Sequence, residues 1–313
     1  MFFRAIVLSC IAVFLFVNYA LAAPASFEQA KAELRRYVYH DRNQSDFGDF
    51  YCGCQWQWVG RSGGRVDLAS CGYQVRAQQT RAERIEWEHV MPAHSFGQQR
   101  LCWQQGGRAN CTANDPVFSR IEADMHNLTP AIGEVNGDRS NFRFGVLPAT
   151  TPQYGQCNVQ VDFKGRVVEP RDQIKGMIAR IYFYMHDRYD LSMSRQQQQL
   201  LMAWDRQFPV SEWELERDRR IAARIGHHNP FVTGERHWSL QYRNQAEGIA
   251  KPEHNNAVNQ PALSAPVRGN KRSKVYHLST CPAYQSLKPE NIEEFSSEQQ
   301  AIQAGYRRAG NCR

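Results

Sequence analysis

The cysteines constrain the fold of this chain more than any other feature. Of nine cysteines only Cys10 lies in an N-terminal apolar leader, and the even number that remains predicts disulfide bonds formed in an oxidising compartment. Cys102 and Cys111 flank a Gly-Gly turn and are predicted to pair, as are the distant Cys281 and Cys312. The sequence leaves the other pairings open, and these involve Cys52, Cys54, Cys71 and Cys157. A zinc cluster is the competing interpretation of the two cysteines at 52 and 54, although their spacing is tighter than that of usual zinc ligands.

Residues 1–22 have the features of a signal peptide. Arg4 precedes the apolar run Ile6–Val17, and Ala20-Leu21-Ala22 fits the small-x-small pattern for cleavage before Ala23. An uncleaved anchor and a lipoprotein at Cys10 are the alternatives, but the apolar run is short for a membrane span. We therefore expect a periplasmic or secreted protein that has no membrane segment after cleavage.

The mature chain is basic, mainly through arginine. Loss of Arg4 lowers Lys+Arg from 38 to 37 against 31 Asp+Glu, which leaves a net charge of +6. Guanidinium groups bind phosphate through two parallel hydrogen bonds, so a basic exported protein is suited to polyanions. Many solvated surfaces carry a similar charge, and this charge alone does not establish nucleic-acid binding.

Helical and strand patterns occupy separate stretches without βαβ alternation, which predicts an α+β fold. The helices are predicted at 26–40, 115–125, 171–187, 194–207 and 211–226. The strands are predicted at Tyr51–Val59, Arg65–Val75 and Ile85–Met91, with a hairpin formed by Val159–Phe163 and Arg166–Val168. Residues 93–115 are predicted to form a long loop, which a compact domain tolerates only if the loop is functional or held by a disulfide.

Composition divides the mature chain into a main domain, a linker and a small module. The main domain is assigned to 23–235, the polar linker to 236–268 and the module to 269–313, with an Ala-containing helix at Ser297–Tyr306. A module of this size is too small to be stable without a staple.

The run Glu86–Ala93 contains the residues best suited to catalysis. It places Glu88 beside His89, and Asn136 follows in a hydrophilic Asn-Gly-Asp-Arg segment. An imidazole can take a proton from water at neutral pH, and carboxylate and amide oxygens are hard ligands for Mg²⁺. Consecutive residues of a regular strand face opposite sides, so the strand must end or bulge for both Glu88 and His89 to reach one site.

Each of these residues also has an ordinary structural interpretation. A lone histidine is more often structural, Glu88 can pair with an arginine, and Asn-Gly is a common turn signal. A protease is excluded by spacing, because His89 and His94 are five residues apart and no His-Glu-x-x-His or Gly-x-Ser-x-Gly motif is present.

Residues 28–232 resemble the bacterial endonuclease I family of periplasmic or secreted nucleases. The resemblance covers about two thirds of the chain. It rests on these segments: Gln55–Trp58, Gly63–Asp67, Glu86–Ala93, Cys102–Arg108, Glu122–Leu128, Glu134–Asn141, Ala179–Met185 and His228–Phe231.

This resemblance implies a ββα-metal (His-Me) finger with added helices and a one-metal mechanism. His89 is then expected to be the general base, Glu88 and Asn136 the ligands of one Mg²⁺, and Arg108 the residue that binds the scissile phosphate. The expected products carry 5′-phosphate and 3′-hydroxyl ends.

The resemblance also suggests supporting roles and a broad substrate range. Glu122 is expected either to support the site or to be a plain helix residue, and Asn127 to orient the finger. Such nucleases have little sequence preference and act on DNA and often RNA, which agrees with binding through phosphates. Candidate backbone contacts are Arg61, Arg65, Arg76, Arg100 and Arg139. We expect a monomer, and the sequence does not indicate an inhibitor partner.

The C-terminal residues resemble the zinc module of Ada-type DNA-repair proteins. The matching segments are Gly269–Lys271, Lys274–Leu278, Cys281-Pro282 and Ala304–Arg307. That pattern uses four cysteine ligands, whereas only Cys281 and Cys312 stand here, so a disulfide is expected in place of zinc. Binding to nucleic acid or to the cell surface is the expected role of the module.

The sequence therefore predicts an exported, Mg²⁺-dependent, nonspecific endonuclease. One competing hypothesis is a disulfide-stapled scaffold that captures DNA without cutting it. A second is a Zn²⁺ hydrolase that uses His227, His228 and His237, whose spacing is not that of a coherent ligand set.

Overall fold

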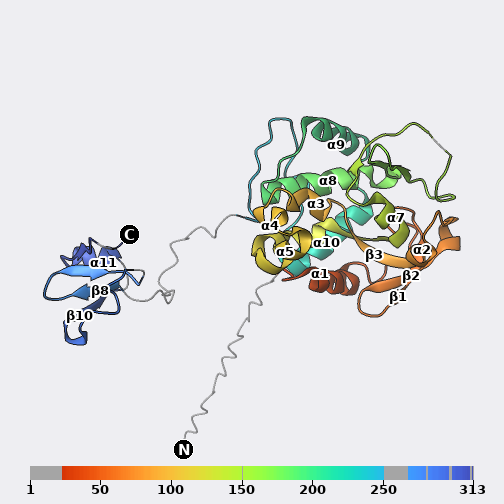
Figure 1. Cartoon of the computed structure of the whole chain (residues 1–313). Helices are drawn as coiled ribbons and strands as arrows, with labels where there is room; N and C mark the ends of the chain where they lie inside the picture. Colours follow the sequence, from red (N-terminus) through yellow and green to blue (C-terminus); the bar gives the residue numbers. More distant parts are fainter. Residues whose placement is uncertain are drawn as a thin grey trace, which may run out of the picture. The chain divides into compact units, whose positions relative to one another are not determined.

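A computed structural model describes residues 23–149, 151–249, 267–279, 281–295, 298–310 and 312. Contacts divide the chain into two compact units, 1–250 and 251–313 (Figure 1). The predicted signal peptide, residues 1–22, lies outside the described residues. No helix in the described part of the chain is long and apolar enough to cross a membrane.

The first unit is built on an antiparallel sheet with the order β1-β2-β3-β4. Its strands are β1 (Gln55–Val59), β2 (Gly63–Asp67), β3 (Arg84–His89) and β4 (Leu128–Ile132). Gly64 of β2 lies so close to its neighbours that a Cβ would fall 2.6 Å from the ring of Trp56 and 3.0 Å from Ile85. The mixture of sheet and helices confirms the predicted α+β class.

The two faces of this sheet pack against different helices. On one face Trp87 and Leu128 join a core with α1 (Phe27–Glu33), the π-helical turn η1 (Leu34–Val38) and α10 (Glu212–Ile225). On the other face Ala131 belongs to the larger core, which includes α7 (Gly133–Arg139) and α8 (Asp172–Tyr189). Helix α9 (Arg195–Gln207) lies beside α8 (Figure 1).

The helix starts predicted from capping residues are present. Asp115 caps α6 (Pro116–Glu122), Ser194 caps α9 and Ser211 caps α10, each by accepting a hydrogen bond from a main-chain N–H of the first turn. The predicted hairpin is formed by β6 (Gln160–Asp162) and β7 (Val167–Glu169), and β5 (Arg143–Phe144) adds to it in the order β5-β7-β6.

The predicted long loop at 93–115 is wrong. The segment forms the short helices α3 (Ala93–Gly97), α4 (Leu101–Gln104) and α5 (Gly107–Asn114). The Cys102–Cys111 disulfide ties α4 to α5, and Cys111 is fully buried. Helices this short are marginal alone, so their stability comes from the disulfide and from burial.

The predicted linker is too long at both ends. Trp238 stacks on Phe183 of α8 with ring centroids 5.0 Å apart, and Tyr242 stacks on Trp238 at 4.7 Å, so 236–249 belong to the first unit. The second unit begins with β8 (Val267–Asn270), inside the predicted linker. Residues 250–266 lie outside the described parts.

The second unit is a small α/β module. Its sheet has the order β10-β8-β9-β11, with β9 at Val275–His277, β10 at Ile292–Phe295 and β11 at Arg307–Arg308. Helix α11 (Glu298–Gln303) accounts for the helix predicted at Ser297–Tyr306, although Ser297 itself is not described.

The disulfides agree with both pairings that the sequence predicted. Cys102 is bonded to Cys111, and Cys281 to Cys312. The pairs left open are Cys52–Cys157 and Cys54–Cys71. The zinc interpretation of Cys52 and Cys54 is therefore excluded, because both sulfurs are in disulfides.

Candidate functional site

His89 is the last residue of β3 and lies beneath α1. Its ring is 7% exposed and its centroid is 4.6 Å from that of Phe27. Nε2 lies 2.8 Å from the carbonyl oxygen of Glu122. Because a carbonyl can only accept, Nε2 carries the proton and Nδ1 keeps the lone pair. Burial, aided by the nearby Arg108 charge, lowers the pKa of His89 to about 3, so the imidazole is neutral at physiological pH.

Glu122 holds Arg108 as well as His89. The guanidinium Nε of Arg108 donates to the Glu122 carboxylate at 2.6 Å, and Thr112 Oγ1 donates to the same carboxylate at 3.3 Å. Glu122 is buried, whereas the Arg108 side chain is 47% exposed. The main-chain carbonyl of Glu122 therefore fixes the tautomer of His89, while the carboxylate of Glu122 holds the exposed guanidinium of Arg108 nearby. These contacts favour the supporting role that the sequence left open for Glu122.

Glu88 lies on the opposite face of β3, in the interior. Its Oε1 accepts a hydrogen bond from Tyr51 Oη at 2.6 Å and lies 2.9 Å from Nη1 of Arg139. Burial raises the pKa of Glu88, and the Arg139 charge opposes this rise. The pairing of Glu88 with Thr129 and of His89 with Leu128 is regular. The strand thus ends at His89 without a bulge, and the two side chains point to opposite faces.

Asn136 stands on α7, on the same side of the sheet as Glu88. Its Nδ2 donates to Glu86 Oε2 at 2.9 Å, and Glu86 is also paired with Arg81 and Arg84. Because alternate strand residues share a face, Glu86 and Glu88 lie side by side. The side chain of Asn136 therefore contacts Glu86. The sequence analysis did not single out Glu86, although its position two residues before Glu88 on one strand could have indicated that both share a face.

Asn127 secures the chain just after β3. Its Oδ1 accepts from the main-chain N–H of Met91 at 2.7 Å, and its Nδ2 donates to the Met91 carbonyl at 2.9 Å. Asn127 is fully buried. These contacts use both ends of the amide and fit the orienting role expected for it.

The candidate nucleic-acid contacts differ in their availability. Arg61 and Arg65 are exposed, whereas Arg76 pairs with Asp138 and Arg100 pairs with Asp115. The prediction for Arg139 is wrong, because its side chain is fully buried. It donates to the carbonyls of His89 and Val90 and cannot face a substrate.

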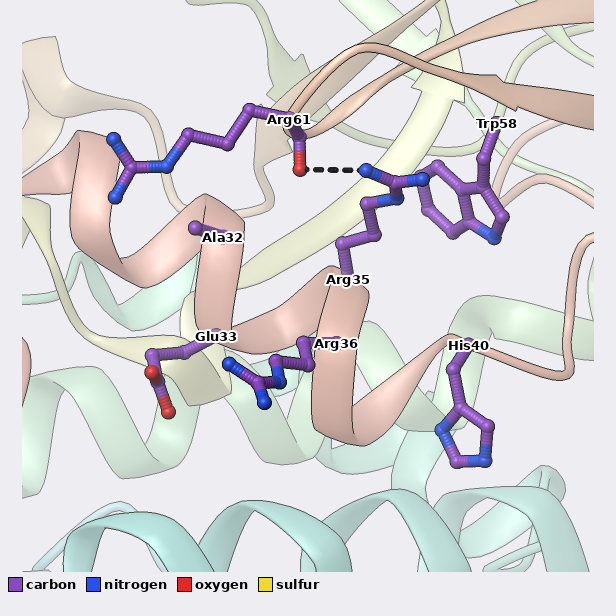
Figure 2. Close-up of a pocket in the computed structure, with 7 residues that line it drawn as sticks. All are labelled: Ala32, Glu33, Arg35, Arg36, His40, Trp58 and Arg61. Atoms are coloured by element: carbon purple, nitrogen blue, oxygen red, sulfur yellow. Dashed lines mark hydrogen bonds between the residues drawn. The ribbon is translucent and has the colours of Figure 1, made fainter.

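A basic pocket of about 530 Å³ lies between α1, η1 and the β1–β2 turn (Figure 2). The side chain of Arg35 donates to the carbonyls of Gly60 and Arg61, which ties the helix to the turn. Arg36, His40 and Arg61 are exposed around the opening. The sequence analysis missed Arg35 and Arg36, although two adjacent arginines near the end of the predicted first helix could have indicated a basic surface there. The remaining lining residues are Ala32, Glu33 and Trp58.

The histidines of the competing zinc hypothesis have other partners. His227 Nε2 lies 2.9 Å from Tyr184 Oη, and His228 Nδ1 lies 2.5 Å from Asp218. Within the described ranges these histidines, with the exposed His237, do not form a group with metal-ligand spacing.

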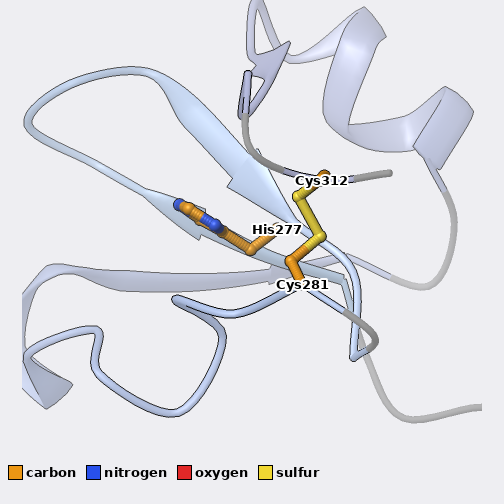
Figure 3. Close-up of side chains that lie close together, drawn as sticks. All are labelled: His277, Cys281 and Cys312. Carbon is orange, nitrogen blue, oxygen red and sulfur yellow. A yellow bond between two sulfur atoms is a disulfide. The ribbon is translucent and has the colours of Figure 1, made fainter.

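A sequence profile of the Endonuclease I family matches residues 26–235, the part of the chain that contains this site. The chain belongs to the endonuclease I family. It is therefore a nuclease, as the resemblance implied. The profile of the metal binding domain of Ada matches residues 259–313, which include all the described residues of the second unit. In that unit His277 lies beside the Cys281–Cys312 disulfide (Figure 3).

Named relatives are similar along most of the first unit. An extracellular deoxyribonuclease of Aeromonas hydrophila is 51% identical over 208 residues, which are 66% of this chain and 88% of that protein. A periplasmic deoxyribonuclease of the same organism is 51% identical over 190 residues, 60% of this chain and 79% of that protein. Endonuclease-1 of Buchnera aphidicola (strain APS of subspecies Acyrthosiphon pisum) is 49% identical over 185 residues, which are 59% of this chain and 73% of that protein. These names agree with the predicted periplasmic or secreted location.

Proposed function

We propose that the first unit hydrolyses phosphodiester bonds of DNA and RNA with His89 as the general base. The observation that carries this proposal is the double role of Glu122. Its carbonyl leaves Nδ1 of His89 as the basic nitrogen, and its carboxylate holds the exposed guanidinium of Arg108 in the same neighbourhood. A base and a phosphate-binding cation held by one buried residue suit in-line attack of water on phosphorus.

The order β3, β4, α7 supports a ββα-metal finger. The strands pair antiparallel, and α7 follows β4 directly and lies on the Glu88 face. Because β3 ends at His89, a phosphate lying across the end of the strand can approach residues of both faces. The opposite orientations of Glu88 and His89 are then compatible with one site.

Glu88 and Asn136 fit a Mg²⁺ ion by their donor chemistry. Among the described residues, the contacts of Glu88 use Oε1 and Asn136 donates to Glu86 through Nδ2, which leaves Glu88 Oε2 and Asn136 Oδ1 as hard oxygen donors. Mg²⁺ takes one or two protein ligands and keeps several waters. When bound, it would neutralise charge that develops on the phosphate and the leaving oxygen.

The residues of the chain then account for the proton and the charge. His89 Nδ1 accepts a proton from the attacking water, whose oxygen forms the new bond to phosphorus as the bond to the 3′ oxygen breaks. The departing 3′ oxygen takes up a proton from solvent water. The terminal nitrogens of Arg108 bind the phosphate oxygens as they gain charge. The products carry 5′-phosphate and 3′-hydroxyl ends.

The substrate range follows from binding through the backbone. Arg36 and Arg61 present positive charge on the α1 side of the sheet, where His89 also lies. Phosphate contacts carry no base information, so we propose cleavage without sequence preference. We further propose that the protein acts as a monomer outside the cytoplasm.

Plasmid cleavage with purified variants tests this function. We expect nicking with Mg²⁺, none with EDTA, and none by His89→Ala under either condition, while the exposed His237→Ala control cuts like wild type. His89→Ala should keep its DNA affinity. An intact plasmid with wild-type protein and Mg²⁺ would favour the DNA-capturing scaffold, and substantial cutting by His89→Ala would remove His89 from the mechanism.

A further inference from the structure

The β6–β7 hairpin of the first unit carries an exposed aromatic ring that the proposed chemistry does not use. Among the large apolar side chains that the described residues expose, Phe163 is the aromatic one, and it is 43% exposed. It stands at the tip of the hairpin, directly after Asp162, the last residue of β6. A single exposed apolar side chain is common on protein surfaces, whereas this ring is held in place and surrounded by positive charge.

The ring of Phe163 is held from two sides. The Cζ atom of Arg76 lies 4.7 Å from its centroid, and the ring of Phe142 meets it edge-on with centroids 6.4 Å apart. The turn is closed by the main-chain N–H of Gly165, which donates to Asp162 Oδ1 at 2.8 Å. A ring that is ordered before binding loses less side-chain entropy when a ligand stacks on it, and nearly half of this side chain remains uncovered for that contact.

Positive charge surrounds the ring. Lys164 and Arg166 are exposed on the same turn, and Arg143 is exposed on the neighbouring strand β5. Arg166 donates to the neutral amide oxygen of Asn141 at 2.6 Å, a contact that leaves its charge uncompensated. Arg166 also has a φ of 55°, a conformation that glycine or asparagine adopts more readily than arginine. A cation at this position fits the binding of a polyanion better than it fits the turn.

The hairpin tip is connected to α7, which carries the candidate metal ligand Asn136. The guanidinium of Arg76 donates to both carboxylate oxygens of Asp138, at 2.9 and 2.7 Å, and Asp138 follows Asn136 by two residues on α7. This path of contacts from Asn136 to the ring of Phe163 is at most roughly 20 Å long, which about six nucleotides cover at 3.4 Å each. A strand that is cleaved beside Asn136 therefore reaches the ring within a few nucleotides.

We propose that the turn 163–166 is a subsite for an unpaired base of the substrate, which stacks on Phe163 while the flanking phosphates bind Lys164 and Arg166. This inference rests on the proposed nuclease function and adds a substrate feature to it. Aromatic rings between cations bind single-stranded nucleic acid irrespective of sequence, because every base has a π-face. A base inside a duplex is stacked on its neighbours and cannot use the ring. The subsite therefore acts on single strands, on frayed ends and on RNA loops.

Binding in EDTA, which prevents cutting, tests the subsite with the full-length protein. The probes are a strand of about 12 thymidine nucleotides, a strand of equal length whose sugars carry no bases, and a duplex of the same length, each labelled for fluorescence anisotropy. We expect Phe163→Ala to weaken binding of the thymidine strand by about 5–100-fold, the range for one stacked base. Its binding of the base-free strand and of the duplex should stay within about twofold of wild type.

Further substitutions separate stacking from apolar bulk and from charge. Phe163→Tyr keeps a ring and should bind like wild type, whereas Phe163→Leu keeps apolar bulk and should bind like Phe163→Ala. Leu215→Ala is the matched control, since Leu215 is 49% exposed on α10 and its loss should not change binding of any probe. Lys164→Gln/Arg166→Gln should weaken binding of all the probes and lower the slope of log affinity against log salt by about 1–2.

The outcomes distinguish this subsite from the nuclease function. Unweakened binding of the thymidine strand by Phe163→Ala, or equal losses on the thymidine strand and the base-free strand, would overturn the subsite even if wild-type protein nicks plasmid normally. Plasmid left intact by wild-type protein with Mg²⁺ would overturn the nuclease function even if the stacking losses were found.

Discussion

Replacing Arg139 by Leu should destabilise the first unit strongly. The guanidinium is fully buried, lies 2.9 Å from Glu88, and donates to the carbonyls of His89 at 3.0 Å and Val90 at 2.6 Å. Leucine would leave a buried carboxylate without its counter-charge and both carbonyls without this donor. Loss of one partner of a buried pair costs about 3–5 kcal/mol. For a domain of this size each kcal/mol lowers Tm by about 2–4 °C, so Tm should fall by roughly 6–20 °C.

Tryptophan fluorescence during heating measures this effect on the first unit alone, because all seven tryptophans lie within it. Arg65→Leu is the matched control, since Arg65 is exposed on β2 and its loss should change stability by about 0.5 kcal/mol or less. DNA affinity in EDTA, measured below the transition, completes the comparison. If Arg139→Leu had the same Tm as the Arg65→Leu control but bound DNA more weakly than wild type, Arg139 would face the substrate. The assignment of Arg139 as the buried partner of Glu88 would then be wrong.

Further predictions concern the support of Arg108, the basic pocket and acid stability. Glu122→Gln weakens the hold on Arg108, so the plasmid cleavage rate should fall about 10–100-fold with an unchanged circular dichroism spectrum; an unchanged rate would count against this role. Arg36→Glu/Arg61→Glu should weaken DNA binding and reduce the slope of log affinity against log salt by about 2, and a slope equal to that of wild type would exclude the pocket from the interface. Asp124 is buried, which alone raises its pKa, but nearby positive charge and tyrosine hydroxyls lower it overall. The charged carboxylate of Asp124 therefore stabilises the folded state above about pH 4, which is the pKa of aspartate in the unfolded chain. This stabilisation is lost as the pH falls further. The unfolding free-energy gap between wild type and Asp124→Asn should narrow in acid, and a gap independent of pH would contradict this.

Local signals in the sequence were sufficient to predict where several elements begin. Ser194, Ser211 and the Asp115-Pro116 pair mark helix starts because each cap acts on the first turn that follows it. The pleat rule likewise indicated that Glu88 and His89 cannot face the same side of a regular strand, and the structure places them on opposite faces.

Elements that depend on distant partners were missed. Asn136-Gly137 is typical of a turn, but the pair lies in α7, where the guanidinium of Arg81 packs so closely on Gly137 that a Cβ there would fall 2.0 Å from its Nη1 and displace it. The helices of 93–115 depend on the Cys102–Cys111 bridge. The first unit extends past its predicted end because Trp238 finds the ring of Phe183, a contact that no local pattern records.

The site was predicted in its residue types more fully than in its contacts. The sequence and the resemblance singled out His89, Arg108 and Glu122, which the structure brings together. They did not indicate that Arg139 is the buried partner of Glu88 or that Asn136 contacts Glu86, because burial and pairing arise only when α7 packs on the sheet.

A crystal structure of His89→Ala with Mg²⁺ and a short DNA duplex tests the central claim most directly. The account predicts one ion held by Glu88 Oε2 and Asn136 Oδ1, the scissile phosphate across the end of β3, and Arg108 on its oxygens. An ion bound elsewhere, or a phosphate far from both Arg108 and position 89, would contradict it.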